Sequence, residues 1–184
     1  MHTELKLFMI LLGCTPKKRL TEQHDIFFGI GTSIEELIPD MYAFWPDGGR
    51  LHIDSWREVT HVDGYDIIVI PKSENKGDHK LFFLNLGGYK PNEFEEFHYK
   101  MLLVSQNMAE AIKTAKKSVF YKHNGFKGAE SHIDDKYAID VDDMHNVADI
   151  LSPQSKAKYS LHITKSAGLL KEDRLHIGYL KLKV

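Results

Sequence analysis

The chain has 184 residues, of which 42% are hydrophobic and 27% charged, a balance typical of a globular protein. Its net charge of −2 lacks the basic excess with which proteins neutralise phosphates, so we expect no nucleic-acid partner. No segment reaches the ~18 consecutive apolar residues of a membrane span, so we expect no membrane partner. The lone cysteine, Cys14, excludes an intramolecular disulfide and favours a reducing compartment, which predicts a cytoplasmic protein.

The first predicted element is a strand at residues 6–13. Residues 7–12 are all apolar and Gly13 ends the run, as in a strand buried on both faces. The string from Leu11 to Cys14 also resembles a bacterial lipoprotein cleavage box. A secretory segment needs a basic start and an apolar stretch of about 7–15 residues, and this run is shorter, so the strand is favoured.

The following residues predict a strand and then a helix. Residues 24–31 contain isoleucine and phenylalanine, which suit a strand, and glycines that oppose a helix. Ser33 precedes Glu36 by three residues at the head of an apolar series with helical spacing. This is the pattern of a capping box, so a helix is predicted over 33–43. Two further strands are predicted at 51–59 and 65–71.

The second half of the chain echoes the first. Between residues 6 and 38, nine of 33 positions are identical to the residue 74 places further on, whereas unrelated segments would share about two. Residues 93–118 are rich in helix formers, so a single long helix there is an alternative to the second copy. The second copy predicts strands at 80–87 and 98–105, a helix at 107–120 capped by Asn107, and a strand at 130–138.

The last part of the chain adds further elements. Residues 142–151 are typical of a short helix that Pro153 stops, and strands are predicted at 159–165 and 175–182. Together the elements predict an α+β fold of tandem duplicated β-β-α-β-β units. We expect mainly antiparallel sheet, with helices packed on one face and pseudo-twofold symmetry.

The repeat also predicts the domain organisation. Two short units that share a core bury more apolar surface than either buries alone, so we expect a single pseudo-symmetric domain. Its expected parts are residues 1–184 as the whole domain, 5–74 as repeat unit one, 79–166 as repeat unit two and 174–184 as a C-terminal strand.

Equivalent polar residues of the two copies are the first candidates for a site. Glu22 is equivalent to Glu96 and His24 to His98, and clefts between repeated units are common ligand sites. Side chains at i and i+2 of a strand share a face, so Glu22 and His24 are predicted to point the same way. A carboxylate beside an imidazole suits acid–base chemistry or a divalent metal ion.

A His-Ile-Asp tripeptide follows each predicted helix, at 52–54 and at 132–134. His52 and Asp54 share a strand face by the same rule. The structural alternative is that such groups cap backbone amides or form local salt links, and further His-Ile pairs at His162 and His176 favour it. The remaining candidate ligand-binding residues are Asp25 and Trp56, of which Trp56 also suits a core or interface anchor.

Several strings of the chain resemble one known family. They are Leu7-Phe8, Leu11-Leu12-Gly13, Glu22-Gln23-His24-Asp25, Phe27-Phe28-Gly29-Ile30-Gly31 and His52-Ile53-Asp54-Ser55-Trp56. Together they resemble the bacterial family catalogued as domain of unknown function 1543, and residues 81–143 look like its diverged repeat. The resemblance covers most of the chain and implies a bacterial, cytoplasmic protein. It implies no activity, no cofactor and no catalytic residues.

Two functions fit these residues. The sequence contains no complete catalytic motif, which favours a non-catalytic module that binds a small ligand or a protein. We expect no cofactor, and a homodimer formed through a sheet edge or a helix face. The alternative is a metal-assisted or acid–base enzyme, hydrolase-like, that uses Glu22, His24, Glu96 and His98 near the interface of the repeats.

Overall fold

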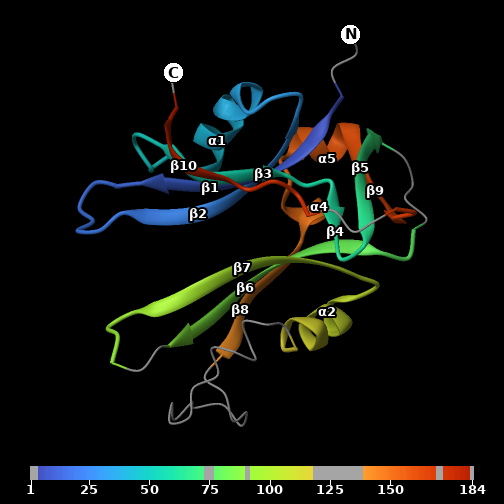
Figure 1. Ribbon diagram of the computed structural model, residues 1–184. Helices are drawn as coiled ribbons and strands as arrows, with labels where there is room; N and C mark the ends of the chain where they lie inside the picture. Colours follow the sequence, from blue (N-terminus) through green and yellow to red (C-terminus); the bar gives the residue numbers. More distant parts are fainter. Residues whose placement is uncertain (1–3, 73–76, 90–91, 118–138, 169–171, 183–184) are drawn as a thin grey trace. The chain divides into compact units, whose positions relative to one another are not determined.

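The computed structural model describes residues 4–72, 77–89, 92–117, 139–168 and 172–182 (Figure 1). The chain forms two compact units. Unit 1 comprises residues 1–76 with 150–184, and unit 2 comprises residues 77–149. Antiparallel sheets dominate and helices are few, which confirms the α+β class.

Among the described residues, strands outnumber helices in both units. The elements of unit 1 are β1 (Lys6–Cys14), β2 (Gln23–Gly31), the 3-10 helix η1 (Glu35–Leu37), α1 (Ile38–Phe44), β3 (His52–Glu58), β4 (His61–Val62), β5 (Tyr65–Pro71), α5 (Pro153–Lys158), β9 (Tyr159–Lys165) and β10 (His176–Lys181). Unit 2 contains β6 (Lys80–Tyr89), β7 (Glu96–Ser105), α2 (Met108–Ala115) and β8 (Ile139–Asn146), and α4 (Val147–Ile150) follows β8.

The strand β1 lies inside the four-stranded sheet of unit 1, whose order is β10-β3-β1-β2 (Figure 1). Its neighbours on both sides are antiparallel to it. Phe8, Ile10 and Leu12 on one face of β1 are buried, and so is Leu7 on the other. Burial on both faces explains the unbroken apolar run and confirms the predicted strand.

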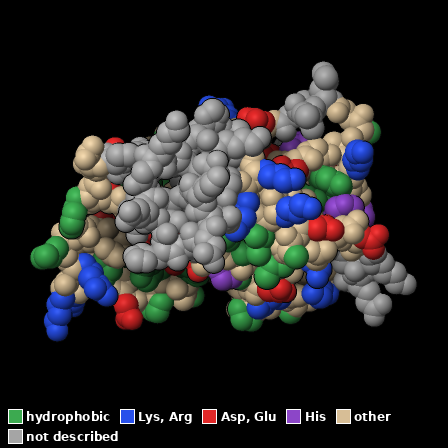
Figure 2. Space-filling view, turned by 90° about the horizontal axis from the view of Figure 1, so that it is seen from below, with side chains coloured by type: hydrophobic (Ala, Val, Ile, Leu, Met, Phe, Trp, Pro, Cys, Tyr) green, Lys and Arg blue, Asp and Glu red, His purple; other side chains and the backbone are tan. Residues whose placement is uncertain are grey.

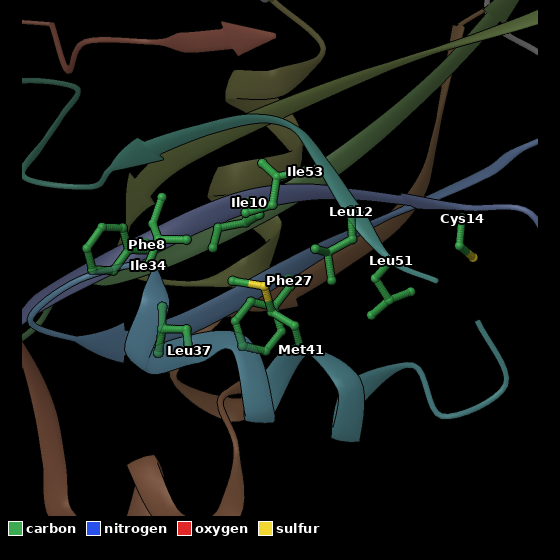
Figure 3. Packing of buried hydrophobic residues seen from close by; sticks show 10 residues of the cluster. All are labelled: Phe8, Ile10, Leu12, Cys14, Phe27, Ile34, Leu37, Met41, Leu51 and Ile53. Carbon is green, nitrogen blue, oxygen red and sulfur yellow. The ribbon is translucent and has the colours of Figure 1, made fainter. Parts of the chain in front are cut away.

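One face of β1 forms the core of unit 1 with α1 (Figure 3). Side chains two residues apart in a strand share a face, so Phe8, Ile10 and Leu12 all meet this core. Leu37 of η1 and Met41 of α1 are buried against them. Complete burial of such a side chain contributes roughly 1.5–3 kcal/mol, and these contacts hold α1 on the sheet.

The helix predicted at 33–43 forms, but its capping differs from the predicted box. Its first residues are the 3-10 helix η1, and α1 follows directly. Glu36 reaches back to the amide of Thr32, at 2.8 Å, rather than to that of Ser33. This bond holds the pKa of Glu36 below its usual range. The backbone amide of Glu35 and, to a lesser degree, the hydroxyl of Ser33 hold the pKa of the Glu35 carboxyl below its usual range.

A separate three-stranded sheet of unit 1 has the order β4-β5-β9. β9 pairs with β5 along its whole length, from Tyr159 opposite Pro71 to Lys165 opposite Tyr65. The predicted extent of repeat unit two, 79–166, stays a prediction. By its pairing with β5, β9 belongs to unit 1. The repeat could not show this, because strand pairing is a long-range choice that adjacent sequence does not determine.

The strand β6 is the central strand of unit 2, with β7 on one edge and β8 on the other, antiparallel to both. Phe82, Leu84 and Leu86 alternate along β6 and face one core. Ala111 and Ala115 of α2 are fully buried in that core. Unit 2 therefore places a helix against its central strand in the same way as unit 1.

The predicted cap of α2 is confirmed. The side-chain oxygen of Asn107 accepts a hydrogen bond from the amide of Glu110, at 3.0 Å. The Glu110 carboxylate in turn accepts a bond from the hydroxyl of Ser105, at 3.2 Å. Since β7 ends at this serine, the predicted strand at 98–105 is confirmed and the long helix over 93–118 is wrong.

The helix predicted at 142–151 is wrong for most of its length. β8 continues to Asn146 and only α4 is helical, because β8 pairs with the apolar strand β6. That pairing outweighs the low strand propensity of its aspartates. Pro153 does not stop a helix but begins α5, whose first turn is capped by Ser152. The strand predicted at 130–138 lies outside the described residues.

Charged side chains are interspersed on the face shown in Figure 2, where Lys and Arg lie among Asp, Glu and apolar groups. The longest α-helix in the described ranges, α2, has eight residues. Within those ranges, none of the helices has the length and apolar character needed to cross a bilayer.

Candidate metal site on the sheet of unit 1

Gly13 of β1 lies between two histidines of the sheet. It is paired with His24 of β2 on one side and with His52 of β3 on the other. Directly opposed residues of antiparallel strands project from the same face. Leu12 and Cys14 belong to the core with α1, so the two imidazoles lie on the opposite face of the sheet.

Two carboxylates join these imidazoles. His24 Nε2 lies 3.1 Å from Asp54 Oδ2 and 3.7 Å from Glu22 Oε2. His52 Nε2 lies 3.1 Å from Glu22 Oε1 and 3.4 Å from Asp54 Oδ1. The two pairs predicted from strand spacing, Glu22 with His24 and His52 with Asp54, therefore come together. We call these four residues the unit 1 cluster.

The unit 1 cluster is buried on one side and open on the other. The side chains of His52 and Asp54 are 6% and 28% exposed, whereas those of His24 and Glu22 are 40% and 44% exposed. The ring of Tyr179 in β10 packs on the His52 imidazole, with centroids 4.4 Å apart. The sheet and this ring together restrict the movement of His52.

Two atoms of the unit 1 cluster lack hydrogen bonds. His52 Nε2 and Asp54 Oδ2 are buried, and neither makes a hydrogen bond with any described residue, although the distances to their neighbours would allow one. More than about 90% of buried polar groups have a hydrogen-bond partner. These two atoms are therefore exceptions among buried polar groups.

Gly13 and a β-bulge make room for this arrangement. A Cβ atom at position 13 would overlap His52 Nε2 and lie 2.7 Å from Asp54 Oδ2, so a side chain there would displace the ring. The register between β1 and β3 shifts between Leu11 and Leu12, which leaves Asp54 without an opposed residue. Bulges of this kind redirect a side chain and are common beside functional sites.

The donor atoms of the unit 1 cluster have the spacing that a metal ion needs. One donor atom each from Glu22, His24 and His52 lie within 4.8 Å of one another. Four ligands at about 2.0–2.1 Å around a tetrahedral zinc ion are about 3.4 Å apart. The nitrogen–oxygen distances in the cluster run from 3.1 to 3.7 Å, near that value, and each carboxylate approaches the two imidazoles with different oxygens. Two carboxylates beside two neutral imidazoles also balance the charge of a divalent ion.

Unit 2 contains a related group, which we call the unit 2 cluster: Glu96, His98 and Asp142. His98 Nε2 lies 3.3 Å from Asp142 Oδ2 and 3.9 Å from Glu96 Oε2. Gly87 is opposed to His98, and a Cβ atom at position 87 would overlap the Asp142 carboxylate. The three residues are exposed, and their donor atoms also lie within 4.8 Å of one another.

The pairs predicted by the repeat belong to two different clusters. Glu22 and His24 contact partners of unit 1, and Glu96 and His98 contact partners of unit 2. Each cluster is thus formed from residues of its own unit. The meeting of the two pairs in a cleft between the copies stays a prediction. The second His-Ile-Asp tripeptide, at 132–134, lies outside the described residues.

Two predicted ligand residues lie apart from the unit 1 cluster. The Asp25 carboxylate accepts a hydrogen bond from the amide of Ile26, at 2.7 Å. Trp56 packs against the core, with its ring 6.1 Å from that of Phe8, and it stacks on His176 at 3.8 Å. These contacts support the interpretation of Trp56 as an anchor.

Sequence reasoning missed one residue of the two clusters, Asp142, and three neighbours that shape them, Gly13, Gly87 and Tyr179. A glycine at the same place in both apolar runs is the signal for Gly13 and Gly87, but it was interpreted only as the end of a strand. Asp142 lies where a helix was predicted, and Tyr179 belongs to a strand that joins the sheet from the end of the chain. The sequence around these two residues carries no signal of their neighbours.

The comparisons with known proteins agree with this fold. Residues 19–69, which include the whole unit 1 cluster, match the family described as Domain of Unknown Function (DUF1543). This match confirms the predicted family resemblance for that segment. The chain is also similar to the crystal structure of a protein Il1583 from Idiomarina loihiensis, with a TM-score of 0.62 and 21% identity over 98% of this chain and 99% of that chain. At that identity the likeness shows a shared fold alone. None of the curated proteins matches the chain.

Proposed function

We propose that unit 1 is a binding module for a divalent metal ion of the zinc class, held by Glu22, His24 and His52. The observation that carries this proposal is the buried His52 Nε2, which makes no hydrogen bond with a described residue yet lies 3.1 Å from Glu22 Oε1. A salt link would satisfy this nitrogen with a hydrogen bond. A metal ion satisfies it through the nitrogen lone pair, and imidazole and carboxylate are both zinc ligands.

Asp54 is placed to be the fourth ligand. Its two oxygens lie 3.1 Å from His24 Nε2 and 3.4 Å from His52 Nε2, which matches the spacing of the other donors. Its Oδ2 is the second buried atom without a hydrogen bond. Two imidazoles and two carboxylates form a mixed donor set that suits zinc better than magnesium or calcium, which prefer oxygen ligands alone.

We also infer that the two units arose by duplication of one ancestral element. The support is their common plan: an inner apolar strand, an antiparallel neighbour that carries Glu-x-His, a helix, and a bulged strand paired on the other side of the apolar strand. We further propose a pseudo-twofold relation between the units, a homodimer and a cytoplasmic location. The support for each of these is the sequence alone.

The test is a zinc titration of the metal-free full chain by isothermal calorimetry. His24→Ala and His52→Ala each remove one ligand. Even the loss of a residue that only orients a metal ligand costs about 10–100-fold in affinity, so the loss of a ligand should weaken zinc binding by about 100-fold or more.

Two controls separate the site from other zinc ligands. His162→Ala removes an exposed imidazole of the same unit. Cys14→Ser removes the thiol, whose pKa is raised by burial and, to a lesser degree, by the charge of Glu22, so that it stays protonated. Both controls should bind zinc like the unaltered chain. The proposal fails if His24→Ala and His52→Ala also bind zinc with unchanged affinity.

The exposure of the unit 1 cluster favours a second candidate function, metal-assisted hydrolysis. A catalytic zinc ion keeps one position open to water, and the exposed side chains of Glu22 and His24 leave that side accessible. Asp54 would then accept a proton from the bound water instead of serving as a ligand. Zinc-dependent hydrolysis of nitrophenyl esters or phosphates that Asp54→Asn abolishes, with zinc affinity retained, would establish this function. Hydrolysis at the same rate in Asp54→Asn would exclude it.

A further inference from the structure

We propose that unit 2 carries a second cation site, formed by Glu96, His98 and Asp142, which favours oxygen-preferring ions such as Mn²⁺ more strongly than the site of unit 1 does. The proposal concerns residues that the zinc site does not contain. The existence of this site can therefore hold or fail independently of the function proposed for unit 1, and only its relative ion preference rests on that function.

The carboxylates of Glu96 and Asp142 converge on the imidazole of His98. His98 Nε2 is 3.3 Å from Asp142 Oδ2 and 3.9 Å from Glu96 Oε2, and one donor atom from each residue lies within 4.8 Å of the other two. Coordination distances to Mn²⁺ are longer than to zinc and its usual coordination number is higher, so somewhat wider and more open donor spacing suits it. The exposure of all three residues leaves room for the water ligands that such an ion retains.

The backbone forms this cluster with the same two features as the unit 1 cluster, namely a glycine opposite the histidine and a β-bulge. Gly87 stands opposite His98, and its missing side chain leaves the space that the Asp142 carboxylate fills. The register of β6 with β8 shifts between Asn85 and Leu86, so that Asp142 is a bulged residue. The space beside the glycine and the bulge at the aspartate lie at one point of the sheet. Together they bring a carboxylate next to the histidine, which regular strand pairing would not do.

One register position distinguishes the two sites. Gly13 is opposed to His52 in unit 1, whereas Gly87 is opposed to Asp140 in unit 2. The position that supplies a buried imidazole to the first cluster is thus an aspartate in the second. Imidazole ligands suit zinc, copper and iron, whereas carboxylates suit manganese, magnesium and calcium. The described unit 2 cluster has one imidazole beside two carboxylates, whereas the unit 1 cluster has two imidazoles, and this difference is the reason to expect a different ion preference.

The test uses the full chain with the unit 1 cluster disabled by His24→Ala and His52→Ala. Binding of Mn²⁺ is followed by loss of the electron paramagnetic resonance signal of the free ion, and zinc affinity is measured by competition. In this background, Glu96→Gln and His98→Ala should each weaken Mn²⁺ binding by at least about tenfold. Glu95→Gln, which alters an exposed neighbour, should leave binding unchanged. Equal Mn²⁺ affinity in all three variants would overturn the site.

Exchange of the distinguishing residue tests the ion preference itself. Asp140→His in the disabled background should raise the ratio of zinc to Mn²⁺ affinity by at least about tenfold, because it restores the imidazole of unit 1. His52→Asp in a chain with His98→Ala should lower the same ratio at the first site. An unchanged ratio in Asp140→His, with circular dichroism showing an intact fold, would overturn the proposed preference. Failure of zinc binding at unit 1 alone would overturn only the function proposed there.

Discussion

The sheet segments β1-β2-β3 and β6-β7-β8 have the same strand pairing. They differ in where the third strand lies relative to the repeated His-Ile-Asp string. In both, the first strand lies in the middle, and its glycine is opposed to the histidine of the second. In unit 1 the third strand contains the string His-Ile-Asp at 52–54. In unit 2 the third strand begins at Ile139, after the matching string at 132–134. Equivalent positions are therefore defined by strand register, and a repeated string does not by itself mark them.

The two helices that follow these strands also differ, in how their first turns are secured. In unit 1 the amide of Thr32 donates to the carboxylate of Glu36. In unit 2 the amide of Glu110 donates to the side-chain oxygen of Asn107. A carboxylate changes charge in acid and an amide side chain does not, so the two units should respond differently to pH.

The largest expected difference between the units follows from their glycines. Gly13→Ala places a methyl group against the His52 ring, which Tyr179 restrains, so the sheet itself must adjust. We expect a loss of about 1–3 kcal/mol in the free energy of unfolding, measured in urea, together with loss of zinc binding. In Gly87→Ala the nearest atoms to the new methyl group belong to the carboxylate of Asp142, an exposed side chain rather than a buried ring, so this substitution should cost less.

The matched control for both glycines is Gly168→Ala. A Cβ atom there meets no atom within 4 Å, so this substitution should stay within about 0.5 kcal/mol of the unaltered chain. If Gly13→Ala behaves like Gly168→Ala and still binds zinc, the unit 1 cluster does not depend on the space beside β1.

The same positions show how much of the fold and of the site could be predicted from the sequence. Local pattern predicted β1, β2 and β3, because apolar runs, alternation and glycines act within a few residues. The strand β7 was predicted from the repeat, against the helix propensity of its own residues. Local pattern also placed Glu22 beside His24, and His52 beside Asp54. That the two pairs meet depends on Gly13 being opposed to both histidines, and that register is fixed by long-range pairing. The failure at 142–151 has the same origin, because only the pairing with β6 makes an aspartate-rich segment a strand.

A smaller effect is expected from the cap of α2. Asn107→Ala removes the acceptor for the amide of Glu110 and should lower the free energy of unfolding by about 1 kcal/mol. The loss should be the same at pH 7 and at pH 4, because the amide side chain does not titrate. Asn107→Asp, which keeps an acceptor oxygen, should recover most of the stability at pH 7. A loss of stability in Asn107→Asp equal to that of Asn107→Ala would contradict this role.

The smallest effect is expected from Glu36→Gln, and its sign depends on pH. The amide of Thr32 stabilises the charged carboxylate in the folded chain and so lowers the pKa of Glu36. The resulting stability is fully present above the unfolded-state pKa of about 4.3, and it is lost as the pH falls through the lower folded-state pKa. Glu36→Gln should therefore destabilise unit 1 slightly at pH 7, and this difference should shrink toward zero in acid, where both side chains are neutral. Urea unfolding at several pH values measures it, and a difference that does not change with pH would show that the charge of Glu36 contributes nothing to the helix start.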